Sequence, residues 1–199
     1  MGVYIPRLEI PYGYYHVGTR GNNRRSIFVD DRDRNLFLLI LRRVARRFGW
    51  QFYAYCLMGN HYHLVLQISE AGISRGMCEL NTAYAVGYNA HHSRTNHLFG
   101  RRYWSELIET DEHLAAAARY VVQNPVRAGI CATCDGWPWS SYRATVGTAI
   151  PQPFLAIDDL LKIVVPGPKE RRVDRFREFC EPLVPKRRVD ASRVWRQPP

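Results

Sequence analysis

The feature that most constrains this chain is a pair of strand-like stretches joined by three residues. Residues 50–57 and 61–68 are rich in aromatic and branched side chains, and residues 58–60 connect them. So short a connection predicts an antiparallel hairpin. Successive side chains of a strand point to opposite faces, so His61 and His63 share one face of the second strand and its apolar residues take the other. The chain should therefore build a sheet with one face on a core.

Two neighbouring imidazoles on one strand face suit two ligands of a single divalent metal ion. The pair His61 and His63 fits this pattern, although two surface histidines on a half-exposed strand would give the same spacing. Three more histidines, His91, His92 and His97, could also form a metal cluster. A polar, exposed helix end explains these three with fewer assumptions.

The remaining metal candidate is a C-x-x-C pair, Cys131 and Cys134. Without a second pair or a following histidine, it predicts two half-buried cysteines after a helix rather than a zinc site. The five cysteines are odd in number and lack the density of a disulfide framework, so we expect free thiols. No long apolar run or secretory signal pattern occurs, which predicts a cytoplasmic protein without membrane contact.

The net charge of +10 points to a polyanionic partner such as nucleic acid, because arginine and lysine release counterions from each phosphate they neutralise. Residues 1–50 carry 10 basic and 4 acidic side chains, and residues 169–199 carry 10 and 5. Residues 51–168 carry 8 and 9, so the two ends hold the whole excess.

The order of the predicted elements indicates the fold class. Side chains that alternate between the two faces predict a first strand over residues 14–20. Apolar residues that recur every three or four positions predict helices. The helices are expected at residues 30–48, 73–92 and 112–123, and a bent last strand is expected within residues 98–109. This order favours an α+β fold of the ferredoxin-like or RRM-like kind, an antiparallel sheet with helices packed on it.

We place the main domain at residues 1–145. Residues 146–199 are expected to form a linker, a short basic helix near residues 169–181 and a disordered basic tail.

A second informative pair lies on the last main helix. Tyr120 and Asn124 are four residues apart, so they face the same way if the helix runs through Asn124. Pro125 follows and predicts that the helix ends before it. A divalent ion held by the two strand histidines and the Asn124 oxygen could polarise a DNA phosphate while Tyr120 attacks it.

At these residues the chain resembles the HUH single-tyrosine transposases, and among them the REP-associated tyrosine transposases. The resemblance runs over residues 14–143 and rests on four motifs: YHVGTRGN at 15–22, LMGNHYH at 57–63, YVVQNPVRAG at 120–129 and WPWSSY at 137–142. It implies an endonuclease and strand transferase that depends on Mg²⁺ or Mn²⁺ and acts on single-stranded hairpin DNA. In that resemblance His61, His63 and Asn124 are the metal ligands, and Tyr120 is the nucleophile that forms a 5′-phosphotyrosine.

The chain departs from the wider family at two positions. Asn124 stands where many insertion-sequence members have glutamine, which favours the REP-associated branch, and Gly59 stands where proline is common. By this resemblance, REP-associated members look monomeric and insertion-sequence members look dimeric. Both oligomeric states stay open for this chain, with the monomer favoured.

Two segments carry polar, basic and aromatic side chains suited to phosphate contacts and base stacking. We predict DNA contacts from Arg20, Asn22, Asn23, Arg24, Arg101, Arg102, Tyr103 and Trp104. For the first segment an ordinary polar turn is an equal alternative. Two rival functions also stay open: a domesticated, non-catalytic binder of DNA hairpins, and a nicking enzyme of the relaxase or replication-initiator kind. The short chain without a helicase segment disfavours the second rival.

Overall fold

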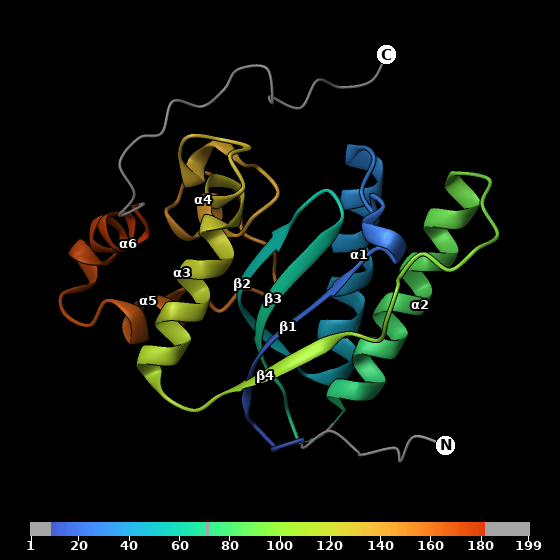
Figure 1. The fold of residues 1–199 in the computed structure, drawn as a ribbon. Coiled ribbons are helices and arrows are strands. Elements are labelled where there is room, and N and C mark those ends of the chain that lie inside the picture. Colours follow the sequence, from blue (N-terminus) through green and yellow to red (C-terminus); the bar gives the residue numbers. More distant parts are fainter. Residues whose placement is uncertain (1–8, 71, 182–199) are drawn as a thin grey trace.

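The centre of the molecule is a four-stranded antiparallel sheet with helices on both faces (Figure 1). The computed structural model describes residues 9–70 and 72–181. Its strands are β1 (Tyr14–Arg20), β2 (Gln51–Leu57), β3 (His61–Gln67) and β4 (Trp104–Ile108), in the spatial order β2-β3-β1-β4. The predicted α+β fold with an antiparallel sheet is confirmed.

Two long helices, α1 (Asp31–Phe48) and α2 (Ile73–His91), cover one face of the sheet. Helix α1 begins with a capping box, in which the side chains of Asp30 and Asp33 each accept a hydrogen bond from the other's backbone N–H. It ends at Gly49, whose φ of 63° lies in the left-handed region that glycine adopts without strain. Both boundaries follow from the local sequence.

The face assignment of β3 is as predicted. Tyr62 is fully buried on the side of α1 and α2, and its hydroxyl donates to the Asn81 side chain over 2.6 Å. His63 lies on the opposite side of the strand, next to α3 (Asp111–Arg127). The strand therefore separates an apolar core from a polar site.

Helix α3 corrects one prediction. The proline after Asn124 predicts the end of the helix, but α3 continues through Pro125 to Arg127. Proline inside a helix removes one backbone hydrogen bond. Here Pro125 is buried, and the preceding Val121 and Val122 belong to the apolar cluster between α3 and the sheet, so packing outweighs that loss. As a result Asn124 has helical backbone, one turn after Tyr120.

The chain after α3 packs against that helix. The short α4 (Tyr142–Thr145) is followed by α5 (Ile157–Val164) and α6 (Arg172–Cys180), the latter in the stretch for which the sequence predicts a basic helix. Phe176 of α6 is fully buried in the same cluster as α3, and the Gln123 amide donates to the Cys180 carbonyl over 3.0 Å. The domain boundary at residue 145 stays a prediction, and the predicted disordered tail lies outside the described residues.

Within the part of the chain that the structure describes, the remaining elements are three 3-10 turns: η1 (Asn22–Arg24), η2 (Cys134–Gly136) and η3 (Lys169–Arg171). Cys134 in η2 is buried, and its thiol donates to the Cys180 carbonyl over 3.7 Å. Burial raises the pKa of Cys134 to about 12, which keeps the free thiol protonated at neutral pH. Among the residues with described coordinates, no helix has the length and apolar character needed to span a bilayer.

Candidate active site

The structure brings together the four residues that the sequence singles out. His61 and His63 point from β3 toward α3, and Tyr120 and Asn124 point back from α3. The rings of His63 and Tyr120 have their centroids 5.6 Å apart, and the Asn124 side chain forms a hydrogen bond with His61. Two imidazoles, a phenol and an amide thus face one space beside the sheet.

A third imidazole, which the sequence analysis missed, completes this cluster. His16 lies on β1, beside β3, and its Nε2 is 3.1 Å from Nδ1 of His63. The alternation of β1 already places His16 on the same face as Arg20. Only the register between β1 and β3, which pairs Gly18 with His63, shows that the two histidines meet.

The hydrogen bonds around the two β3 histidines orient their rings. Nδ1 of His61 is 2.6 Å from Oδ1 of Asn60, and because an amide oxygen only accepts, Nδ1 must carry the proton. The Asn60 amide is held in turn, since its nitrogen donates to the Arg24 carbonyl over 3.0 Å. In His63 the Nδ1 atom faces His16. In His61 the proton on Nδ1 leaves Nε2, on the side of Asn124, as the atom that can bind a metal ion, and in His63 either ring can donate across the contact with His16.

Burial keeps these imidazoles neutral. It lowers the pKa of His16 to about 4, with a smaller effect from His113. Burial and the charge of Arg20 lower the pKa of His61 to about 4, opposed by the hydrogen bond with Asn124. For His63, burial and then His16 and His61 lower the pKa to about 3. At neutral pH all three rings can therefore offer a lone pair rather than a positive charge.

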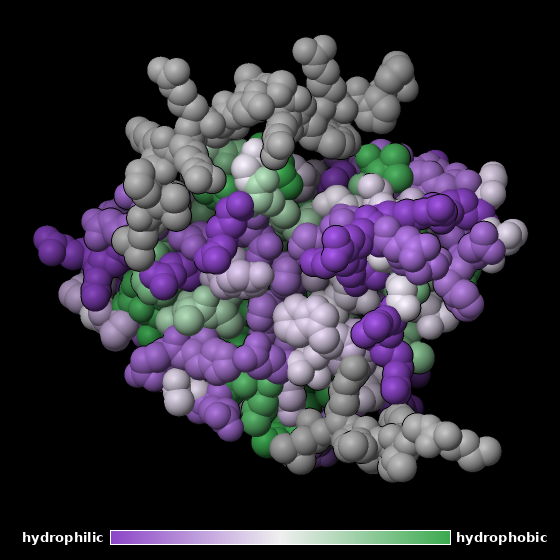
Figure 2. All heavy atoms as spheres, in the orientation of Figure 1, coloured by the Kyte–Doolittle hydropathy of each residue, from purple (hydrophilic) through white to green (hydrophobic). Residues whose placement is uncertain are grey.

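The predicted DNA contacts fall in two adjacent segments. The backbone N–H of Asn22 donates to the Leu98 carbonyl over 2.8 Å, so the turn after β1 lies against the segment that leads into β4. All but one of the predicted residues are exposed: Arg20, Asn22, Asn23, Arg24, Arg101, Arg102 and Trp104. Figure 2 shows that hydrophilic side chains dominate this side of the molecule.

Tyr103 is the exception and corrects the prediction. It is only 5% exposed, belongs to the core under α1 and α2, and has its hydroxyl 3.1 Å from the Ser74 hydroxyl. Side chains alternate along the chain here, so the ring of Tyr103 enters the core while the indole of Trp104 lies on the surface of the α3 side. Of these two neighbours, Trp104 is the one whose ring is open to a base.

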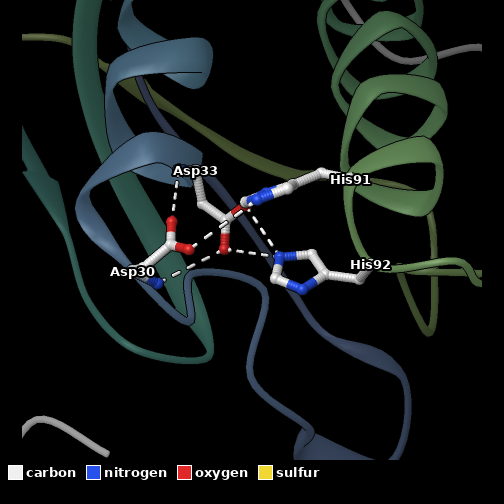
Figure 3. A group of neighbouring side chains, drawn as sticks. All are labelled: Asp30, Asp33, His91 and His92. Atoms are coloured by element: carbon white, nitrogen blue, oxygen red, sulfur yellow. Dashed lines mark hydrogen bonds and ion pairs between the residues drawn. The ribbon is translucent and has the colours of Figure 1, made fainter. Parts of the chain in front are cut away.

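A second polar cluster lies on the other side of the sheet, where α1 begins and α2 ends (Figure 3). It contains Asp30, Asp33, His91 and His92, whose donor atoms all lie within 4.8 Å of one another. Such a group could hold a divalent ion, whose identity the structure does not show. The expectation of an exposed helix end is wrong for His91 and His92, which are half-buried against α1, and His97 lies outside the group.

Hydrogen bonds within this cluster hold α1 against α2, and we call the cluster the clamp. Nε2 of His92 is 2.9 Å and Nδ1 of His91 is 3.2 Å from Oδ1 of Asp33. The other oxygen, Oδ2 of Asp33, accepts the backbone N–H of Val29 over 2.8 Å. Asp33 is completely buried, so its carboxylate depends on these partners.

We predict that Asp33→Ala lowers the free energy of unfolding by about 3 kcal/mol at pH 7, since it leaves a cavity at a buried position and takes the acceptor from the Val29 N–H and both imidazoles. Although burial raises the pKa of Asp33, hydrogen bonds from Val29, His92 and His91 bring it below 3.8. The stabilisation is therefore present above pH 3.8 and lost as pH falls through the folded pKa. Urea denaturation of wild type and variant from pH 7 to 3 checks both the size and the sign. An equal difference at every pH, or none at pH 7, contradicts the clamp.

Comparison with known proteins decides the family. The model of the family described as "Transposase IS200 like" matches residues 10–124, more than half of the 199 residues. The chain belongs to the IS200-like transposase family. Membership of this family makes the chain a DNA-processing enzyme of the transposase kind, and the resemblance carried by its sequence motifs is confirmed.

Two relatives refine this placement. A REP-associated tyrosine transposase of Haemophilus influenzae is 25% identical over 127 residues, which are 58% of this chain and 72% of the relative. A solved structure of a REP-associated tyrosine transposase bound to a REP hairpin aligns with a TM-score of 0.64 at 20% identity. The alignment covers 79% of this IS200-like transposase and 90% of that chain. At that identity the likeness supports the fold alone.

Proposed function

We propose that this protein is a metal-dependent endonuclease and strand transferase that cuts single-stranded hairpin DNA of the REP palindromic type through a covalent 5′-phosphotyrosine. The observation that carries the proposal is the position of Tyr120, which lies on α3 with its ring 5.6 Å from that of His63 and one turn before Asn124. A nucleophile and three groups with metal-binding atoms thereby face one space.

The donor set fits a divalent ion. His61 and His63 can each offer a neutral Nε2, and Asn124 can offer its oxygen because its nitrogen donates to the Tyr120 carbonyl over 3.1 Å. A set of two nitrogens and one oxygen suits Mn²⁺ at least as well as Mg²⁺, which prefers oxygen ligands. Such an ion, when bound, supplies charge neutralisation at a phosphate and a fixed position for it.

Tyr120 is the group that attacks. Its side chain is 38% exposed, so a phosphate of bound DNA can reach its hydroxyl. The Oη atom forms a bond to phosphorus while the bond from phosphorus to the 3′ oxygen breaks, and the phenolic proton leaves with the solvent or the 3′ oxygen. The guanidinium of Arg127 lies 5.2 Å over the Tyr120 ring, where it can contact the same phosphate. Reversal of the step rejoins a strand without an external energy source.

The DNA partner follows from charge and from the relatives. Arginines at the turn after β1 and at residues 101–102 are exposed on the segments that adjoin the site, and they can contact the hairpin backbone. The solved relative is described as bound to a REP hairpin, which supports the same substrate class here. The monomeric state that the REP-associated branch favours stays a prediction.

The test uses oligonucleotides from palindromes that flank the gene for this protein. Each is supplied as a folded single strand with unpaired flanks and as a perfect duplex, with Mg²⁺, with Mn²⁺ or with chelator. We expect cleavage of the folded strand with either ion, little cleavage of the duplex and none with chelator. Equal cutting of both forms contradicts the substrate assignment. Tight hairpin binding without cleavage under any condition would favour the non-catalytic binder.

The orientation of His63 gives a further prediction. His16→Phe keeps a ring of similar size in a position only 7% exposed but removes the hydrogen-bond partner of His63. Loss of such an outer partner typically weakens metal binding by about 10- to 100-fold. Titration of Mn²⁺ followed by electron paramagnetic resonance measures this affinity without DNA. His97→Phe, at an exposed histidine, is the matched control. Unchanged Mn²⁺ affinity in His16→Phe contradicts the orienting role.

A further inference from the structure

A cleft of about 380 Å³ lies beside Tyr120, between β4 and α3. The cleft is continuous with the site, because His16 and His63 also line it. Its other walls include the indole of Trp104 from β4 and, from α3, the side chains of Ala116, Ala117 and Tyr120. Sites for small ligands begin at about 300 Å³, so a cleft of this size suits one nucleotide rather than a helix of DNA. The alanines leave the space opposite the indole open.

Trp104 is fixed in place before any ligand binds. The indole lies across Gly18, which pairs with Trp104 between β1 and β4, and a Cβ atom at Gly18 would come within 2.8 Å of the indole Cζ2. The rings of His16 and His63 pack on the indole with centroids 4.6 Å and 5.7 Å away. Yet Trp104 remains 41% exposed. A rigid indole with an open face stacks on a base at little cost in conformational entropy.

The part of the cleft lined by Glu106 favours a base over a phosphate. Glu106 and His113 line it, with His113 Nε2 3.8 Å from Glu106 Oε1. A carboxylate repels a phosphate but can accept a hydrogen bond from the amino group of a base. The basic side chains that suit the DNA backbone lie outside this cleft, at the turn after β1 and at residues 101–102.

We infer that this cleft holds an unpaired base next to the scissile phosphate, stacked on Trp104. The inference rests on the proposed function, because it takes the phosphate attacked by Tyr120 as its neighbour. Such a base would anchor the strand so that one phosphate, rather than the next, meets the tyrosine. Stacking supplies most of the affinity, and the carboxylate of Glu106 favours bases with an exocyclic amino group over thymine.

The test scans the unpaired part of the hairpin with single abasic nucleotides and measures equilibrium binding in chelator, so that no cleavage is needed. In the wild type we expect one abasic position, next to the mapped cleavage point, to weaken hairpin binding by about tenfold. In Trp104→Ala the same abasic position should leave the affinity for the hairpin unchanged, because the stacking partner is already missing. Every other abasic position should weaken both proteins alike. Trp104→Phe keeps an aromatic face and should retain the effect, and thermal denaturation checks that both variants fold.

Additive losses at every abasic position overturn the inference, as does an equal effect in wild type and Trp104→Ala. The result separates the cleft from the reaction. If one abasic position depends on Trp104 but the protein never forms a DNA adduct, the base-binding cleft is supported and the proposed chemistry is contradicted. If an adduct forms at Tyr120 but no abasic position depends on Trp104, the chemistry is supported and the base-binding cleft is contradicted.

Discussion

His63→Ala is expected to abolish DNA cleavage while the hairpin still binds. In the proposed site the variant removes one of two imidazole ligands, and we expect His61 and Asn124 alone to bind the ion too weakly for catalysis. A bound ion contributes several kcal/mol at a phosphate, and a loss of about 4 kcal/mol corresponds to about a thousandfold in rate. Hairpin affinity should change little, because the exposed arginines proposed to contact the DNA backbone lie elsewhere.

Three measurements separate this effect from a folding defect. Because His63 is buried, thermal denaturation and circular dichroism must first show that His63→Ala is folded at the assay temperature. Mn²⁺ titration should then show loss of binding at this site. His97→Ala removes an exposed imidazole and should cut at the wild-type rate. Cleavage by folded His63→Ala within a few-fold of wild type would exclude a ligand role for His63.

The sequence predicts the hairpin and the placement of His61 and His63 because both depend on local rules. A two-residue period decides which side chains share a face of β3, and the same rule puts Tyr62 in the core. The capping box and Gly49 likewise mark the ends of α1 through residues close in the chain.

Other features depend on contacts between distant segments, and the local pattern does not contain them. Pro125 predicts a helix end, but burial of α3 against the sheet keeps the helix intact through it. His16 meets His63 only through the register of β1 and β3. Asp33 meets His92 through the packing of α1 on α2.

Tyr103 and Trp104 show that shifting the start of a strand by one residue changes which side chain faces the core. Both are aromatic and follow two arginines, so the sequence favours both as DNA contacts. Their side chains point to opposite faces, and only the structure shows that Tyr103 enters the core.

The central claim is that Tyr120 becomes covalently linked to DNA. Tyr120→Phe keeps the ring and its packing against His16 and His63 but removes the only atom that can attack the phosphate. Because the side chain is partly exposed, the change should cost little stability, and the hairpin should bind as before. We expect cleavage and adduct formation to fall below detection.

The most direct test mixes hairpin DNA, labelled at its 3′ end, with the protein and Mn²⁺ or Mg²⁺, and analyses the products under denaturing conditions. The wild type should give a labelled protein–DNA band, and peptide mapping should place the DNA on Tyr120. Tyr12→Phe, which alters an exposed tyrosine outside the site, should give the same band, and Tyr120→Phe should give none. A labelled band from Tyr120→Phe, or cleavage by the wild type with no adduct at any time point, would contradict the account.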